Sequence, residues 1–139
     1  MENLTSIGSY AFQNCAALTS IVVPESVTSI NDYTFSGCAK LTTVSLSSQT
    51  TAIGNYAFNG CTSLTTLTLN SNVIERIGAY AFQNCSNLAN IYVPASVATI
   101  GEYAFNGCSV LVINCGATFQ PDDWDYNWNP SNCTVAWGK

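Results

Sequence analysis

Residues 77–85 read IGAYAFQNC, and close copies of this phrase occupy residues 7–15, 30–38, 53–61 and 100–108. The cysteines that end the copies follow one another at spacings of 23, 23, 24 and 23 residues. A fixed period of about 20–50 residues is typical of a solenoid, in which each coil is a small unit stacked on the next. The period therefore predicts an α/β repeat solenoid of about five coils rather than a single globule.

The segment between two copies predicts a short strand. Residues 20–24 read SIVVP, in which the apolar residues Ile21 and Val23 alternate with an outward position. Alternation with period two is the pattern of a half-buried strand, and the proline that closes the segment cannot extend a hydrogen-bonded ladder. A second extended piece is expected to follow, with Val27 and Ile30 pointing inward. The strands of successive coils then line up in parallel on one face of the stack.

The repeated phrase itself predicts one turn of helix at Tyr-Ala-Phe, on the side of the coil opposite the strand. Two columns on either side of this turn contain only Gly and Asn, the residues that tolerate positive φ. We therefore expect two left-handed corners in each coil. The first column is Gly8, Asn31, Gly54, Gly78 and Gly101, and the second is Asn14, Gly37, Gly60, Asn84 and Gly107.

Three apolar columns predict the core, because no coil can bury its own apolar residues without a neighbour. Stacked cysteine side chains run parallel, which disfavours disulfides, and a linear row facing a dry core cannot surround a zinc ion. We expect the five cysteines that end the repeated phrase to be small buried hydrophobes. Cys115 and Cys133 lie outside the repeat, and the sequence leaves undecided whether they form a disulfide. The columns are Phe12, Phe35, Phe58, Phe82 and Phe105; Leu18, Leu41, Leu64, Leu88 and Leu111; and Cys15, Cys38, Cys61, Cys85 and Cys108.

The composition excludes several function classes. Charged residues make up 8% of the chain, against roughly 25% in ordinary domains. The net charge of −5, with Lys40, Arg76 and Lys139 as the only basic residues, argues against nucleic acid as a partner. No apolar run approaches the roughly 20 residues that cross a bilayer, so membrane insertion is not expected. The first residues lack the basic and apolar regions of a signal peptide.

Catalysis is not expected either, because the chain contains no histidine. Its absence removes the most frequent general base and the most frequent metal ligand. Asp122, Asp123 and Asp125 form the only acidic cluster. They could bind calcium or act as paired carboxylates, but a solvated turn is the favoured interpretation. The sequence therefore predicts no enzyme, no cofactor and no metal.

Two surfaces are candidate binding sites. The first is the strand face, whose outward residues are small and polar except for Tyr92, an amphipathic anchor. The second is a column of tyrosines, whose rings could stack on a sugar, meet a partner protein, or pack laterally with half-exposed hydroxyls. The strand face comprises Ser20, Val22, Thr43, Ser45, Thr66, Thr68, Asn90 and Tyr92, and the tyrosine column Tyr10, Tyr33, Tyr56, Tyr80 and Tyr103.

The pattern C-x-x-L-x-x-I-x-V-P-x-S-V-x-x-I-G-x-x-A-F, which stands almost intact at residues 85–105, resembles the BspA-like leucine-rich repeats of the Treponema pallidum type. The resemblance covers residues 1–119. It implies a right-handed curved solenoid with the strands on its concave face, usually in secreted or cell-surface bacterial proteins, some of them adhesins. The resemblance thus implies a concave protein- or glycan-binding face.

The tail, residues 120–139, resembles the Trp-rich ending that closes such stacks in many bacterial members. Trp124, Trp128, Trp137 and Phe119 are expected to cover the last coil, and residues 134–137 to form a final strand. The division predicted is therefore a repeat solenoid over residues 1–119 and a capping segment of the same domain over residues 120–139.

Three departures from the pattern carry further expectations. The second coil replaces Gly, Ala and Pro by Asn31, Thr34 and Ser47. The third coil has one extra residue near residues 73–76, for which we expect a local bulge or wider turn and no break in the stack. Residues 1–7 align with residues 24–30, which leaves the strand at residues 21–23 with an unpaired edge. An open edge invites pairing with another chain, so the alternative function is self-assembly into a homo-oligomer through this edge and the tyrosine column.

Overall fold

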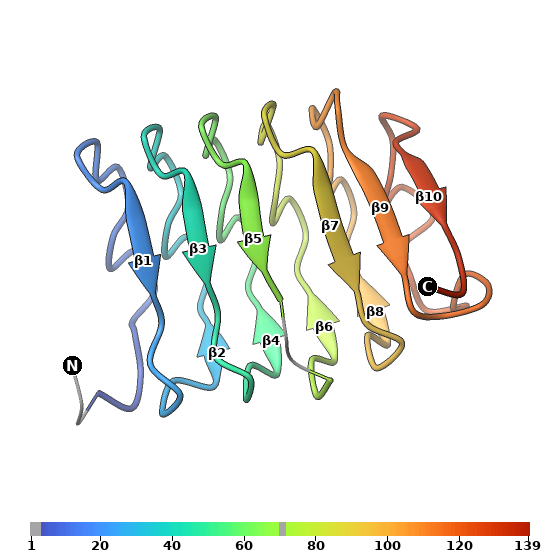
Figure 1. Ribbon diagram of the computed structural model, residues 1–139, viewed down its shortest axis with the longest axis horizontal. Helices are drawn as coiled ribbons and strands as arrows, with labels where there is room; N and C mark the ends of the chain where they lie inside the picture. The colour runs from blue at the N-terminus through green and yellow to red at the C-terminus, as the bar shows by residue number, and fades with distance from the viewer. Residues whose placement is uncertain (1–3, 70–71) are drawn as a thin grey trace.

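The computed structural model describes residues 4–69 and 72–139. The chain winds as a solenoid with two rows of parallel strands, which lie one behind the other in Figure 1. The long row contains β1 (Ser20–Val22), β3 (Thr43–Ser45), β5 (Thr66–Thr68), β7 (Asn90–Val93), β9 (Val112–Cys115) and β10 (Thr134–Ala136). The short row contains β2 (Ser29–Ile30), β4 (Ala52–Ile53), β6 (Arg76–Ile77) and β8 (Thr99–Ile100). The predicted stack of coils with parallel strands is confirmed.

The turn segment opposite the long strands is not helical. Within the described ranges the chain forms strands and turns, and the Tyr-Ala-Phe segment is a run of β-turns instead of the expected turn of helix. In the third coil the Cys61 N–H donates to the Phe58 carbonyl at 3.2 Å, closing one such turn. The Phe58 N–H instead donates to the Ala81 carbonyl of the next coil at 2.8 Å. Because alternate N–H groups leave their own coil, a continuous helical ladder cannot form.

The left-handed corners lie partly where the sequence does not place them. The second Gly/Asn column has positive φ throughout, with 58° at Asn14 and 75° at Gly60, as predicted. The first column does not, and this prediction is wrong. The other left-handed residue of each coil is instead the tyrosine, with φ values from 54° at Tyr103 to 64° at Tyr10.

The first glycine column serves close approach between coils. A Cβ atom on Gly54 would lie 2.5 Å from the Asp32 Oδ1 atom, and one on Gly78 would lie 2.5 Å from the Asn55 Oδ1 atom. Real Cβ atoms do not approach other heavy atoms so closely, and the contact is with a side chain that is itself hydrogen-bonded. Glycine is therefore required here for its missing side chain and not for its backbone freedom.

The apolar columns form the core as predicted. Adjacent phenylalanine rings stack with centroids 5.3–5.5 Å apart. Four of the five phenylalanines are fully buried, whereas Phe12 in the first coil is partly exposed. The leucine column behaves in the same way, with Leu18 as its partly exposed member.

Four of the five column cysteines are buried and Cys15 is partly exposed; all five thiols are free, but they are more than apolar filler. The Cys61 Sγ atom donates to the Phe35 carbonyl at 3.1 Å, and the thiols of Cys38, Cys85 and Cys108 make the same contact one coil apart. Cys133 lies outside this series, as expected: its Sγ atom donates at 3.2 Å to the carbonyl of Cys108 and not to a phenylalanine carbonyl. Cys115 and Cys133 are not bridged.

The tail continues the stack as a degenerate sixth coil. Strand β10 pairs with β9, with Val135 opposite Ile113. Trp128 packs edge-on against Phe105, with ring centroids 6.0 Å apart, and Trp124 lies 4.9 Å from Trp128. Both indoles are buried, but Phe119 is 73% exposed and does not cover the last coil as expected.

The extra residue of the third coil falls in the loop between β5 and β6. The short row is one continuous sheet in the order β2-β4-β6-β8, and the aromatic columns run through the coil without interruption. The long row, however, divides into a β1-β3-β5 sheet and a β7-β9-β10 sheet. The stack is thus unbroken in its core, as expected, but its long-strand face is split between β5 and β7.

The polar departures of the second coil satisfy their own hydrogen bonds. The Asn31 Nδ2 atom donates to the Ile7 carbonyl at 2.6 Å, and the buried Thr34 hydroxyl donates to the Asn31 carbonyl at 2.8 Å. The Ser47 hydroxyl accepts the Gln49 N–H at 3.0 Å. Each replacement therefore brings a partner with it, as buried polar groups require.

Candidate functional site

The outward side chains of the long strands form an exposed face, which we call the long-strand face. Their inward neighbours, such as Val44 and Ile91, are 2% exposed, so the period-two alternation is realised as predicted. Thr68 belongs to β5, but its side chain lies outside the described ones. Of the other predicted site residues, Ser20, Val22, Thr43, Thr66, Asn90 and Tyr92 are exposed and Ser45 is half-buried.

A groove of about 350 Å³ lies over the split between β5 and β7 and extends across β7 to Asn114 of β9, the ladder partner of Tyr92. It brings together three predicted site residues, Thr66, Asn90 and Tyr92. Four further lining residues were missed by sequence reasoning: Thr65, Leu67, Ile91 and Asn114. The single 24-residue spacing could have indicated Thr65, Leu67 and Ile91, because it marks the coil in which the two halves of the face part. Asn114 is the position of Tyr92 in the next coil, so extending the outward positions by one coil would have indicated it.

Backbone groups of both flanking strands point into this groove. In a parallel ladder, successive residues of a strand direct their N–H and C=O groups to opposite neighbours. The Thr66 N–H donates to the Thr42 carbonyl at 3.3 Å, so Thr66 faces β3. The Val93 carbonyl accepts the Gly116 N–H at 2.8 Å, so Val93 faces β9. The polar backbone groups of Leu67 and Tyr92 therefore face the gap, where β5 and β7 form no ladder with each other.

Tyr92 stands at the edge of the groove and is 41% exposed. Its hydroxyl lies over Gly116, where an added Cβ atom would come within 2.7 Å of the phenol oxygen and 2.8 Å of the Ala95 nitrogen. Gly116 thus leaves the space in which the tip of the ring rests. The ring leans toward β9, so its side that borders the groove is left uncovered.

The tyrosine column is a continuous stack of rings. Neighbouring centroids are 4.7 Å apart from Tyr10 to Tyr80 and 5.3 Å apart between Tyr80 and Tyr103. Tyr33 and Tyr56 each have a parallel ring on both sides, so only their edges and hydroxyls reach solvent. Loss of water around the phenol is the main cause that raises the pKa of Tyr33, with the neighbouring Tyr56 and Tyr10 adding to it.

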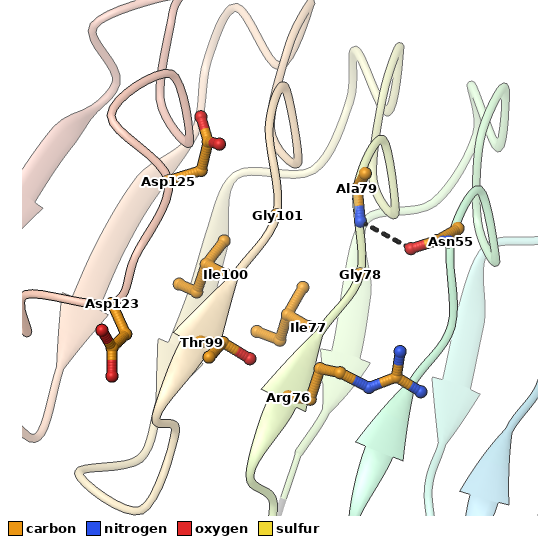
Figure 2. Close-up of a pocket in the computed structure, with 10 residues that line it drawn as sticks. All are labelled: Asn55, Arg76, Ile77, Gly78, Ala79, Thr99, Ile100, Gly101, Asp123 and Asp125. Carbon is orange, nitrogen blue, oxygen red and sulfur yellow. Dashed lines mark hydrogen bonds between the residues drawn. The ribbon is translucent and has the colours of Figure 1, made fainter.

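A second hollow of about 300 Å³ lies on the short-strand side, between β6, β8 and the tail. Its lining includes Arg76, Thr99, Asp123 and Asp125 (Figure 2). Arg76 extends toward Asn55 and away from the two carboxylates, and the Asn55 Oδ1 atom accepts the Ala79 N–H at 2.9 Å. Two glycines of the first column, Gly78 and Gly101, are also among the lining residues.

The acidic cluster is an ordinary turn. Asp122 and Asp123 are exposed, and the Asp125 Oδ1 atom accepts the Asn127 N–H at 2.8 Å. Among the residues that the structure describes, no three His, Cys, Asp or Glu side chains lie together as metal ligands would. Burial raises the pKa of Cys61 and Cys108 to about 12, so these thiols stay protonated and unreactive at neutral pH.

The BspA type leucine-rich repeat region matches residues 2–120, in six copies. The chain belongs to this family. Repeats of this kind are typically non-catalytic and have the potential to bind proteins. No helix in the described parts of the chain is long and apolar enough to span a membrane.

Three solved structures of other bacterial proteins share the fold. The leucine-rich repeat protein of T. pallidum matches with a TM-score of 0.68 and 31% identity, over 78% of this chain and 50% of that one. A leucine-rich cell surface protein of Faecalibacterium prausnitzii A2-165 gives 0.72 and 24%, over 86% and 32%. The pneumococcal vaccine antigen PcpA gives 0.66 and 24%, over 81% and 36%. The chain thus spans about half the length of the T. pallidum structure and about a third of the length of the other two. A search of curated proteins found no match.

Proposed function

We propose that this chain is a non-catalytic binding module of a secreted or cell-surface bacterial protein, and that it holds a protein or glycan on the long-strand face. The observation that carries the proposal is the groove between β5 and β7, bordered by the exposed ring of Tyr92. Tyrosine supplies contact area at low entropic cost, and aromatic anchors beside a hollow are frequent hot spots. The cell-surface F. prausnitzii relative supports the proposed location.

The same face explains why the module would work as part of an array. One groove of about 350 Å³ offers little surface to a macromolecular ligand. Repetition of such coils along a longer chain would raise the apparent affinity through effective concentration. The relatives, which exceed this chain in length, support an array of this kind. We further propose that residues 1–119 form the repeat solenoid and that residues 120–139 close it.

The test compares two tyrosines on opposite surfaces. Tyr92→Ala is expected to weaken binding to an immobilised panel of matrix proteins and oligosaccharides by at least ~1 kcal/mol, with little change in melting temperature because the ring is exposed. Tyr56→Ala, on the tyrosine column, is the matched control. If Tyr56→Ala abolishes binding and Tyr92→Ala does nothing, the functional surface is the tyrosine column.

Self-assembly remains the second candidate, and one observation favours it. β1 is the outer strand of its sheet, and its Val22 is 70% exposed beside the open edge. Edge strands with apolar side chains pair readily with other chains, and a lysine there prevents pairing. Light scattering of the purified chain decides between the candidates. A mass that rises with concentration and returns to the monomer in Val22→Lys supports assembly, whereas a monomer at all concentrations supports the binding module.

A further inference from the structure

We propose that the β5–β7 groove is a site for an uncharged sugar of one or two rings. The inference rests on the proposed function and names the ligand chemistry that this site accepts. None of the described residues that line the groove carries a charge, although the chain contains eight acidic and three basic residues. A charged ligand would lose its water without gaining a counter-charge, which is unfavourable. The groove therefore selects a neutral ligand.

The polar groups of the groove match a ring of hydroxyls. Asn90 and Asn114 each carry an amide that can both donate and accept, and the Thr66 hydroxyl can do the same. A sugar hydroxyl also donates and accepts, so such groups pair with it in either direction. The backbone groups of Leu67 and Tyr92 that face the gap add further fixed donors and acceptors. Every polar atom of an uncharged sugar thus has a suitable class of partner here.

The apolar requirement of a sugar is met by Tyr92. A pyranose ring presents C–H groups on its faces, and these pack on an aromatic surface. Among the described residues that line the groove, Tyr92 is the one aromatic residue, and its hydroxyl is held over Gly116, away from the gap. The hydroxyl is therefore already packed over Gly116, and the face of the ring is available to stack on a sugar. Its stacking side should remain useful without the hydroxyl.

The size of the groove argues against an extended peptide strand. A strand inserted between β5 and β7 would need them to stand about 10 Å apart, which is two ladder spacings. The same two coils are held together behind the groove by the β6–β8 ladder, in which Ile77 pairs with Ile100. They are also held by the stacked Phe58 and Phe82 rings, with centroids 5.3 Å apart. The volume of about 350 Å³ lies at the small end of the range of about 300–1,000 Å³ for small-molecule sites.

The experiment titrates the ¹⁵N-labelled chain with cellobiose, lactose and N,N′-diacetylchitobiose, and with the acidic sugar sialyllactose. We expect at least one neutral disaccharide, added to about 50 mM because small polar sites bind weakly, to shift the side-chain amide signals of Asn90 and Asn114 saturably. Tyr92→Ala should raise the dissociation constant at least about fivefold. Tyr92→Phe should change it less than about twofold, and Tyr56→Ala should leave it unchanged.

The inference is overturned if no neutral disaccharide shifts these amides, if only sialyllactose does, or if Tyr92→Ala has no effect on the shifts. These failures are distinct from failure of the proposed function. Binding of a matrix protein that depends on Tyr92, without any effect of the sugars, would sustain the long-strand face as a protein site and reject the sugar. Tyr92→Phe keeps the test valid in case the alanine variant alters the fold.

Discussion

At the scale of single residues, the least expected feature is the backbone of the five tyrosines. They hold φ between 54° and 64°, although the left-handed region costs an L-residue roughly 1–2 kcal/mol. The stack offsets this cost, because parallel rings 4.7 Å apart contribute about 0.5–1.5 kcal/mol per pair beyond area burial. The tyrosine column is thus first of all a structural element.

The left-handed backbone reverses the usual order of stability, in which an alanine variant is more stable than a glycine variant. Tyr56→Gly should be more stable than Tyr56→Ala by about 1 kcal/mol, because both lose the ring but only alanine keeps the left-handed strain. At Tyr92, in the middle of β7, the order should be the ordinary one, with glycine less stable than alanine. Urea unfolding of the four variants measures both differences. Alanine being the more stable at both positions would show that the left-handed backbone carries no strain.

Sequence reasoning could not locate these corners because glycine has two uses. Gly60 is present for its positive φ, whereas Gly54 is present because a side chain would strike Asp32. Both appear in the sequence as columns of Gly and Asn. A tyrosine in the left-handed region gives no sequence signal, since bulky residues normally avoid it.

The cysteine column predicts a loss of stability at high pH. Burial raises the pKa of Cys61 from 9.0 to about 12, so the thiol is neutral in the folded chain after it has ionised in the unfolded chain. Stability is therefore complete below pH 9 and falls between pH 9 and about 12, by about 1.4 kcal/mol per pH unit for each such thiol. Urea unfolding in a reductant across this range should give a shallower slope for Cys61→Ala. Equal slopes for variant and parent would contradict the burial argument.

At the scale of elements, a polar ladder connects the coils beside the glycine column. The Asp32 Oδ1 atom accepts the Asn55 N–H at 2.8 Å, and the Asn55 Oδ1 atom accepts the Ala79 N–H at 2.9 Å. Ala79 has no side-chain acceptor to offer Glu102, whose N–H stands at the same repeat position. Asn55 is therefore the last side chain of the ladder, although the next coil offers a further N–H group at Glu102.

Ala79→Asn should extend this ladder. The new amide oxygen would accept the Glu102 N–H, and Gly101 leaves space for it as Gly54 does for Asp32. We expect a gain of about 0.5–1.5 kcal/mol in the free energy of unfolding, measured by urea unfolding. Asn55→Ala, which removes an existing step, is the matched opposite and should lose a similar amount. A destabilised Ala79→Asn would mean that the Glu102 N–H prefers water.

The elements also show where prediction from the sequence ended. Strand positions and their inward residues, such as Leu67 and Ile91, follow from period two and the repeat register. The split between β5 and β7 does not, because the extra residue lies in the loop after β5 while the separation affects the strands. The effect of the extra residue depends on how two neighbouring coils pack while their short strands stay in one sheet. This packing is decided between coils and cannot be seen in the sequence of one coil. The groove residue Thr65 was missed for this reason, whereas Asn114 was missed because the predicted face ended at the fourth coil and Asn114 lies opposite Tyr92 on β9.

At the scale of the whole molecule, stability comes from contacts between coils. Phe35, Phe58, Phe82 and Phe105 are each fully buried because a coil lies on both sides, and Phe12 is partly exposed. Burial of a large side chain contributes roughly 1.5–3 kcal/mol, so each interior coil depends on its neighbours. Trp128 takes the next place after Phe105 and makes the tail part of the same core.

This arrangement makes Trp128 decisive for the last coils. Trp128→Ala should lower the free energy of unfolding by about 3–5 kcal/mol, because it removes a buried indole from the end of the phenylalanine column. Trp128→Phe should lose less, since it keeps a ring against Phe105 and gives up the second ring of the indole, which packs near Trp124, and the bond of the indole N–H to the Gln120 Oε1 atom at 3.0 Å. Phe119→Ala is the control, as that ring is 73% exposed. Amide hydrogen exchange should show protection lost first around residues 105–115 in Trp128→Ala, because opening begins where the cover is missing. If Trp128→Ala melts like the parent, the tail does not close the stack, and the core of the solenoid ends at Phe105.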